Sequence, residues 1–105
     1  MRVEFTDSAK ADLRDLRSYL LRYKPKGTWE LVKKQIQEKM EYIAKYPDSG
    51  STPEELQDYP DGFRQILTNQ QRIIYRASTD IIYIHVICGQ VQDFNELLTK
   101  KLTRP

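Results

Sequence analysis

The stretch that decides the fold is residues 63–88, FRQILTNQQRIIYRASTDIIYIHVIC. It contains three runs rich in Ile, Val, Tyr and Thr, residue types that favour strands, and two short polar clusters separate them. The runs cover residues 63–68, 72–77 and 81–88. Links this short join antiparallel neighbours, because parallel strands need a long crossover. We therefore predict an antiparallel meander whose last, almost wholly apolar strand is covered on both faces.

Upstream of the meander, the sequence predicts a short strand and a first helix. Residues 1–5 alternate as a strand does, and Thr6 or Asp7 can cap the helix that follows. Lys24-Pro25-Lys26-Gly27 ends this helix, because Pro and Gly disfavour continuation. Its apolar residues recur at helical spacing, with the charged residues largely on the other face. The apolar set is Ala9, Leu13, Leu16 and Leu20, and the charged set is Lys10, Asp12, Arg14, Asp15 and Arg17.

A second helix is predicted after this break, with Thr28 as its cap. It should end near Tyr46, because Pro47 disfavours helical geometry in the residue before it. Residues 54–57 can form one helical turn, and residues 91–102 carry a weaker helical pattern. The predicted order is β-α-α-β-β-β-α, an α+β fold with a helical hairpin packed on one face of a curved sheet. The apolar positions of the second helix are Trp29, Val32, Ile36, Met40 and Ile43.

Length and composition indicate a single domain over residues 1–105, with 39% hydrophobic and 30% charged residues. No apolar run approaches the roughly 18 residues of a membrane span. The N-terminus lacks the charged start and apolar stretch of a secretory signal. Cys88 is the one cysteine, so no intramolecular disulfide can form. We therefore expect a cytoplasmic protein with no membrane partner.

The charge balance leaves the partner open. A net charge of +2 is too small to indicate nucleic-acid binding by itself. The basic residues are unevenly placed, which is compatible with an acidic partner and equally with a solvated surface of mixed charge. They cluster at Lys24, Lys26, Lys33 and Lys34, and again at Lys100, Lys101 and Arg104.

Several chemistries are absent from the sequence. The four glycines do not form a nucleotide-binding loop. One histidine, His85, and one cysteine cannot form a zinc site. His85 lies inside an apolar strand, where a packed histidine is a better interpretation than a catalytic base. We expect neither a cofactor nor a metal.

Arginines on the predicted sheet are more informative. Arg64 lies in the first long strand, and Arg72 and Arg76 share a face of the central strand with Ile74 by period two. If the helices cover the opposite face, these guanidinium groups can hold phosphates or carboxylates of a partner. The alternative is that Arg64 and Arg72 pair with Asp or Glu within the fold. The sequence does not choose between them.

Five short motifs in order give the chain a family resemblance. It resembles the RelE/ParE superfamily, the toxins of bacterial type II toxin–antitoxin systems, and is more similar to ParE-like members. The resemblance covers nearly the whole chain. The motifs are Thr6-x-x-Ala9-x-x-Asp12-Leu13, Tyr46-Pro47-Asp48-Ser49-Gly50, Gly62-Phe63-Arg64, Arg72-Ile73-Ile74-Tyr75-Arg76, and residues 84–88 leading to Gln92-Asp93-Phe94-Asn95-Glu96-Leu97-Leu98.

The resemblance implies one of two activities. RelE-like members are ribosome-dependent mRNA endonucleases, whereas ParE-like members poison DNA gyrase and stabilise cleaved DNA. Of the RelE-like basic set, only Arg64 and Arg72 have counterparts here, and they would be the catalytic residues of a metal-independent ribonuclease. Losing one charge-stabilising group typically costs about 10²–10³ in rate. This sequence departs from the RelE-like pattern in several places. Ile66 stands where a second basic residue would follow, and Gly89-Gln90-Val91-Gln92 stands after the last strand where basic residues would cluster. No tyrosine occurs after Tyr83, and Cys88 stands where the family commonly has a histidine.

The resemblance therefore favours a ParE-like toxin that binds gyrase, blocks DNA religation and catalyses no reaction. Its other partner would be a cognate antitoxin, in a hetero-oligomer, through an acidic, apolar-studded segment. One alternative is a RelE-like endonuclease acting on mRNA in the ribosome, and another is a non-toxic member that only assembles with its antitoxin on operator DNA. The expected partner-binding residues are Arg64, Arg72, Arg76, Tyr19, Tyr23, Lys33, Lys34, Lys100 and Lys101.

Overall fold

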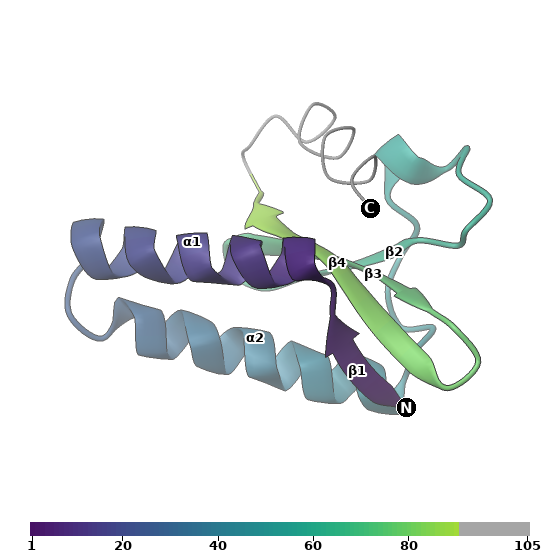
Figure 1. Ribbon diagram of the computed structural model, residues 1–105, viewed down its shortest axis with the longest axis horizontal. Coiled ribbons are helices and arrows are strands. Elements are labelled where there is room, and N and C mark those ends of the chain that lie inside the picture. The colour runs from purple at the N-terminus through teal and green to yellow at the C-terminus, as the bar shows by residue number, and fades with distance from the viewer. Residues whose placement is uncertain (91–105) are drawn as a thin grey trace.

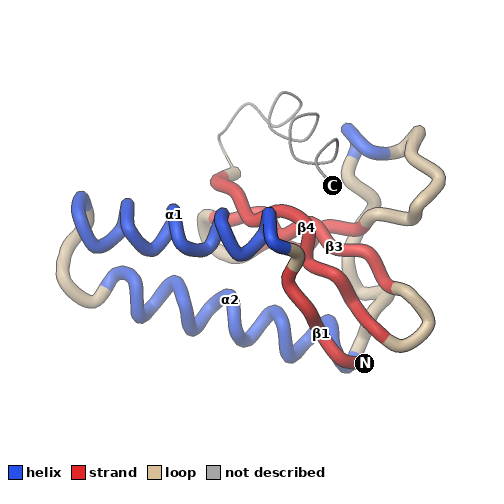
Figure 2. The backbone as a smooth tube through the Cα atoms, viewed as in Figure 1, coloured by secondary structure: helices blue, strands red, loops and turns tan. Residues whose placement is uncertain are grey.

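The computed structural model describes residues 1–90 and has a helical hairpin on one face of a four-stranded sheet (Figure 1). Two helices run side by side along the molecule, and the strands cross behind them (Figure 2). The predicted α+β fold is confirmed over this range. The helix predicted over residues 91–102 lies outside the described residues. The elements are β1 (Arg2–Phe5), α1 (Asp7–Tyr23), α2 (Thr28–Lys45), the 3-10 turn η1 (Glu54–Leu56), β2 (Arg64–Leu67), β3 (Gln71–Ala77) and β4 (Ile81–Gly89).

The predicted meander is confirmed. Strands β2, β3 and β4 pair antiparallel in sequence, and β1 adds to the far side of β4 in parallel, so the order across the sheet is β1-β4-β3-β2. The parallel pair is possible because the whole helical hairpin lies between β1 and the meander and provides the long connection. This places the hairpin against the face formed by β1, β4 and β3.

One helix start was predicted correctly and the other was not. The Thr6 side chain accepts a hydrogen bond from Ala9 N–H at 3.1 Å, as a cap should. At α2 the cap is Gly27 rather than Thr28, which is the first helical residue. The chain reverses between the helices in a tight turn closed by Thr28 N–H and the Pro25 carbonyl, 3.1 Å apart. That turn needs a φ of 93° at Gly27, a conformation that glycine adopts without steric cost.

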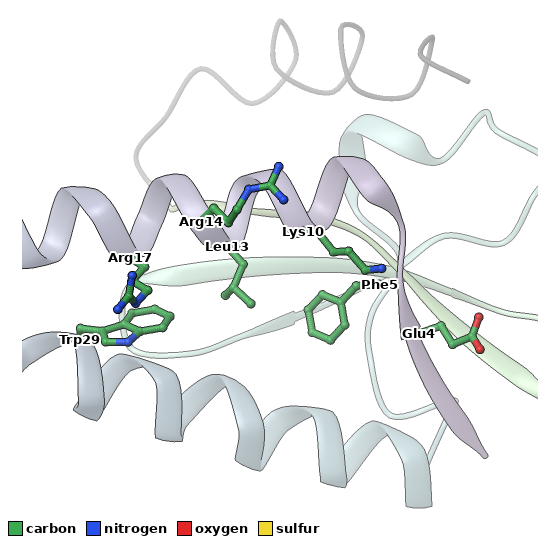
Figure 3. A pocket seen from close by; sticks show the side chains of 7 residues that line it. All are labelled: Glu4, Phe5, Lys10, Leu13, Arg14, Arg17 and Trp29. Carbon is green, nitrogen blue, oxygen red and sulfur yellow. The ribbon is translucent and has the colours of Figure 1, made fainter.

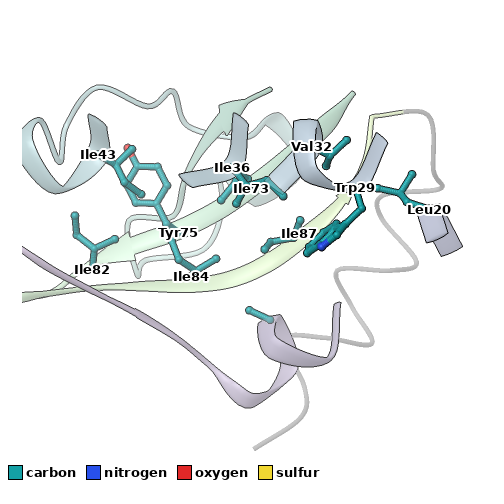
Figure 4. Close-up of a cluster of buried hydrophobic side chains, with 11 residues drawn as sticks. Leu20, Trp29, Val32, Ile36, Ile43, Ile73, Tyr75, Ile82, Ile84 and Ile87 are labelled. Atoms are coloured by element: carbon teal, nitrogen blue, oxygen red, sulfur yellow. The ribbon is translucent and has the colours of Figure 1, made fainter. Parts of the chain in front are cut away.

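The core lies between the hairpin and the sheet, and the apolar stripes of both helices point into it (Figure 4). Leu20 and Trp29 close the end near the hairpin turn, while Ile43 and Tyr75 lie at the other end. Phe5, Leu13 and Met40 pack against this core and remain partly exposed. Burial of this apolar surface is the main favourable contribution to folding. The core residues are Ala9, Leu20, Trp29, Val32, Ile36, Ile43, Ile73, Tyr75, Ile82, Ile84 and Ile87.

A bulge at His85 lets β4 bury side chains on both of its faces. Ile74 pairs with Val86 and Tyr75 with Ile84, so His85 is the extra residue between them. Beyond the bulge the alternation changes phase. Ile82, Ile84 and Ile87 join the core under the helices, whereas Val86 and Cys88 join a second cluster with Leu56, Phe63 and Ile74.

Asp12 fastens α1 to this irregular strand. Its carboxylate accepts a hydrogen bond from the Ile87 N–H at 3.0 Å, across 75 residues of sequence. The helical pattern had assigned Asp12 to the charged outer face. It reaches the sheet instead, because the peptide N–H groups beside a bulge lose their regular ladder partners.

Candidate functional site

The sheet face opposite the helices, which we call the second face, carries Arg72, Ile74 and Arg76 of β3, as period two predicts. This face is not open. Leu56 of η1 and Phe63 cluster with Ile74 on it, and all three are buried. The arginines therefore lie around the edge of a small second core.

Arg72 is held by two neighbours. Its Nη1 and Nη2 donate to the two carboxylate oxygens of Glu55 at 3.0 and 3.3 Å, and its Nε and Nη2 donate to the Gln65 side-chain oxygen at 3.1 and 2.6 Å. Only 14% of the Arg72 side chain is exposed. The hydrogen bond from Arg72 lowers the pKa of Glu55, although burial opposes this shift, so the pair is ionised at neutral pH.

Arg64 and Arg76 also face acidic groups of the fold. Arg64 donates to the Gly50 carbonyl at 2.8 Å and lies 3.7 Å from the Asp48 carboxylate. Arg76 lies 4.0 Å from the Asp61 carboxylate and 6.0 Å from the centre of the Phe63 ring. Of the two interpretations that the sequence left open for Arg64 and Arg72, pairing within the fold is the one observed.

His85 packs beside these residues as a half-buried side chain. Its ring meets Phe63 edge to face, with centroids 5.3 Å apart, and its Nε2 has no hydrogen-bond partner among residues 1–90. Burial lowers the pKa of His85, the positive charge of Arg76 lowers it further, and Asp61 opposes both. The packed role expected from the sequence agrees with this environment.

This shift predicts a pH dependence of stability. Because the folded-state pKa lies below the ordinary value of 6.5, the unfolded chain binds more protons between those two pKa values, and stability falls as pH drops below about 6.5. In His85→Gln this slope should be absent. Urea unfolding at pH values from about 7.5 to about 5.5 measures it. Glu55 titrates below its ordinary 4.5 and stays outside this window. Parallel stability curves for the two proteins would contradict the assignment.

A groove lies on the helix side of the molecule (Figure 3). It has a volume of about 740 Å³ and lies between α1 and α2. Phe5, Leu13 and Trp29 form its apolar floor. We name it the hairpin groove, and it is lined by Glu4, Phe5, Lys10, Leu13, Arg14, Arg17 and Trp29.

The rim of the hairpin groove is basic. Lys10, Arg14 and Arg17 follow one another along α1 and are all exposed. No carboxylate within residues 1–90 forms an ion pair with any of them. The helical pattern assigned these cations to the charged face of the first helix and did not reveal the groove. Their spacing of four and three residues is the signal that could have indicated a single stripe.

The helices also expose two aromatic pairs. Tyr19 and Tyr23 of α1, which the sequence predicts to bind a partner, lie with ring centres 5.2 Å apart and are 50% and 63% exposed. A pair that the sequence did not reveal, Tyr42 and Tyr46, lies at the end of α2 with centres 5.1 Å apart. The predicted Lys33 and Lys34 are exposed on α2, and Lys100 and Lys101 lie outside the described residues.

Within the described part of the chain, no group of three or more His, Cys, Asp and Glu side chains could hold a metal ion. No helix of residues 1–90 is both long enough and apolar enough to cross a membrane.

Comparison with known proteins identifies the family. The family model for the ParE toxin of the type II toxin–antitoxin system parDE matches residues 3–94. No curated protein sequence matches the chain. Among solved structures, a chain of the chromosomal ParDE system from P. aeruginosa has the same fold, with a TM-score of 0.65 and 20% identity over 85% of this chain and 95% of that one. The chain belongs to the ParE toxin family of type II toxin–antitoxin systems.

Proposed function

We propose that this protein arrests growth in the cytoplasm by binding DNA gyrase and blocking DNA religation, and that it does so without catalysing a reaction. A metal-free ribonuclease needs cations free to stabilise a phosphorane and a leaving group. The single observation that carries the proposal is the state of Arg72, which is mostly buried and bonded to Glu55 and Gln65. Arg64 is likewise bonded to the Gly50 carbonyl.

We further propose that a cognate antitoxin neutralises the toxin in the hairpin groove. An apolar floor of Phe5, Leu13 and Trp29 beside the cations of α1 suits an acidic segment studded with apolar residues. Such a segment can fold onto its partner as an amphipathic helix. The cations would steer its approach and the floor would hold it.

Controlled expression of the chain alone tests the function. Growth arrest with filamentation and an SOS response, together with linearised plasmid when the purified protein meets gyrase, supports gyrase poisoning. Intact DNA with message cut in translating ribosomes would overturn it in favour of the endonuclease. Undisturbed growth would overturn it in favour of a regulatory member. Alanine at Arg64 or Arg72 is a poor probe here, because each change also removes bonds that hold the fold.

A further inference from the structure

A second cavity lies on the second face, beside η1. It has a volume of about 340 Å³ and is mainly polar in character, unlike the hairpin groove. Among the residues 1–90 that line it, Arg72 is the one cation, and Glu55 forms an ion pair with it at 3.0 Å. The lining residues are Glu54, Glu55, Gln65, Leu67, Arg72 and Gln90.

The Arg72–Glu55 contact has the form in which arginine binds an oxyanion. Two guanidinium nitrogens meet two oxygens of one acidic group at 3.0 and 3.3 Å. A planar guanidinium recognises carboxylate and phosphate in this same two-point way. The Glu55 side chain thus occupies the position that an oxyanion from outside the chain would take.

Arg72 is oriented independently of Glu55. Gln65 on the adjacent strand β2 accepts from its Nε and Nη2 at 3.1 and 2.6 Å. The guanidinium is therefore fixed from the strand side while its other edge faces η1. An arginine held in this way keeps its direction when the carboxylate is withdrawn, which lowers the entropic cost of binding a replacement.

The other two arginines of strands β2 and β3 lack this arrangement. The carboxylates nearest to Arg64 and Arg76 lie at 3.7 and 4.0 Å and are 89% and 51% exposed. By comparison, the Glu55 side chain is 21% exposed and lies on a 3-10 turn of three residues. The next residue of this turn, Leu56, is buried and anchors its backbone.

We infer that Arg72 and Gln65 form an oxyanion site that the chain closes with its own Glu55 carboxylate. A phosphate or a partner's carboxylate enters only by displacing Glu55. A ligand of this site must therefore offer two acceptor oxygens and compete with the Glu55 carboxylate for Arg72. This inference stands apart from gyrase binding, because it concerns which anions the second face accepts.

Titration of the protein with inorganic phosphate tests the site, with the Arg72 Nε–H resonance as the readout. Glu55→Ala should bind phosphate at least about tenfold more tightly than the wild type, because it frees a two-point charged contact. Glu54→Ala is the matched control, since it removes the same charge from the same cavity but has no bond to Arg72. Equal phosphate affinity of the two variants would overturn the inference.

The wild-type protein provides a second measurement, which does not depend on the folding of Glu55→Ala. Its Arg72 resonance should stay unchanged at phosphate concentrations that shift the exposed Arg14. An equal shift of both resonances would overturn the closed site. Repeating the titration of Glu55→Ala with acetate distinguishes the source of the ligand. Tighter phosphate binding supports a site for nucleotide or nucleic-acid phosphate, and comparable acetate binding supports a site for an acidic side chain of a protein.

Discussion

Gly50→Ala is expected to destabilise the protein by about 3 kcal/mol, because a Cβ at this position has no room. It would lie 2.5 Å from the Tyr75 hydroxyl oxygen and 2.6 Å from the Gln65 carbonyl oxygen. The second of these is backbone of β2 and cannot rotate away. The loop before the sheet must therefore shift, and urea unfolding of the variant measures the cost.

The shift would break a set of bonds that converges on this loop. Gly50 N–H donates to the Tyr75 hydroxyl at 2.9 Å, and that hydroxyl donates to the Pro47 carbonyl at 3.0 Å. Arg64 holds the same loop from outside, through the Gly50 carbonyl at 2.8 Å. A side chain at position 50 pushes against all of these contacts at once, so the expected loss exceeds that of an ordinary surface substitution.

A double-mutant cycle separates the two clashes. Tyr75→Phe alone should cost about 1–2 kcal/mol, because it leaves the Gly50 N–H and the Pro47 carbonyl without their partner. In the double variant the hydroxyl clash is gone, so the combined cost should be less than additive by about 1 kcal/mol. Ser49→Ala, an exposed change in the same turn, is the control and should stay within about 0.5 kcal/mol of the wild type. A similarly small effect of Gly50→Ala would show that the loop is free to move.

The turn containing Gly50 illustrates what the sequence can and cannot predict. In the Tyr46-Pro47-Asp48-Ser49-Gly50 motif, the last four residue types predict a turn, because each of them favours one locally. They do not reveal that Gly50 meets Tyr75, which lies 25 residues away. Local propensity and period identify elements, and contacts across the sequence require the fold.

The same distinction explains the strand bulge. Three runs of strand-forming residues gave the correct meander, because periodicity over several residues is a strong signal. The phase change at His85 was not predicted, since Ile84, Val86 and Ile87 are all apolar and either face could have received them. The register between β3 and β4 determines which face of the sheet receives each of these side chains.

The candidate sites were harder to predict than the fold. Sequence alone showed that Arg72 and Arg76 share a face, but Glu55 and Asp61, their acidic neighbours, lie in an irregular segment whose path no periodicity predicts. The hairpin groove depends on how far α1 and α2 separate over β1, which is a property of three packed elements. Trp29 was therefore predicted to be core, whereas it is both core and groove floor.

Reversing the charges on the rim of the hairpin groove is expected to weaken antitoxin binding by about 100-fold or more. Three like charges would then face an acidic segment, and such juxtapositions cost several kcal/mol. The substitutions are Lys10→Glu, Arg14→Glu and Arg17→Glu. The fold should persist, because these exposed side chains form no ion pair with residues 1–90. Trp29 is the one tryptophan and lines the groove, so its fluorescence reports binding of a cognate antitoxin.

A matched variant decides whether antitoxin binding depends on where the cations lie or only on the net charge of the protein. Lys33→Glu, Lys34→Glu and Lys45→Glu change the net charge equally on exposed positions of α2, outside the groove. If the groove is the docking surface, cells expressing this variant are rescued by the antitoxin, and cells expressing the rim variant are not. In the rim variant the salt dependence of binding should reverse, because salt then screens a repulsion instead of an attraction. Loss of rescue with the α2 set alone would move the docking surface to Lys33 and Lys34, two of the residues that the sequence predicted to bind a partner.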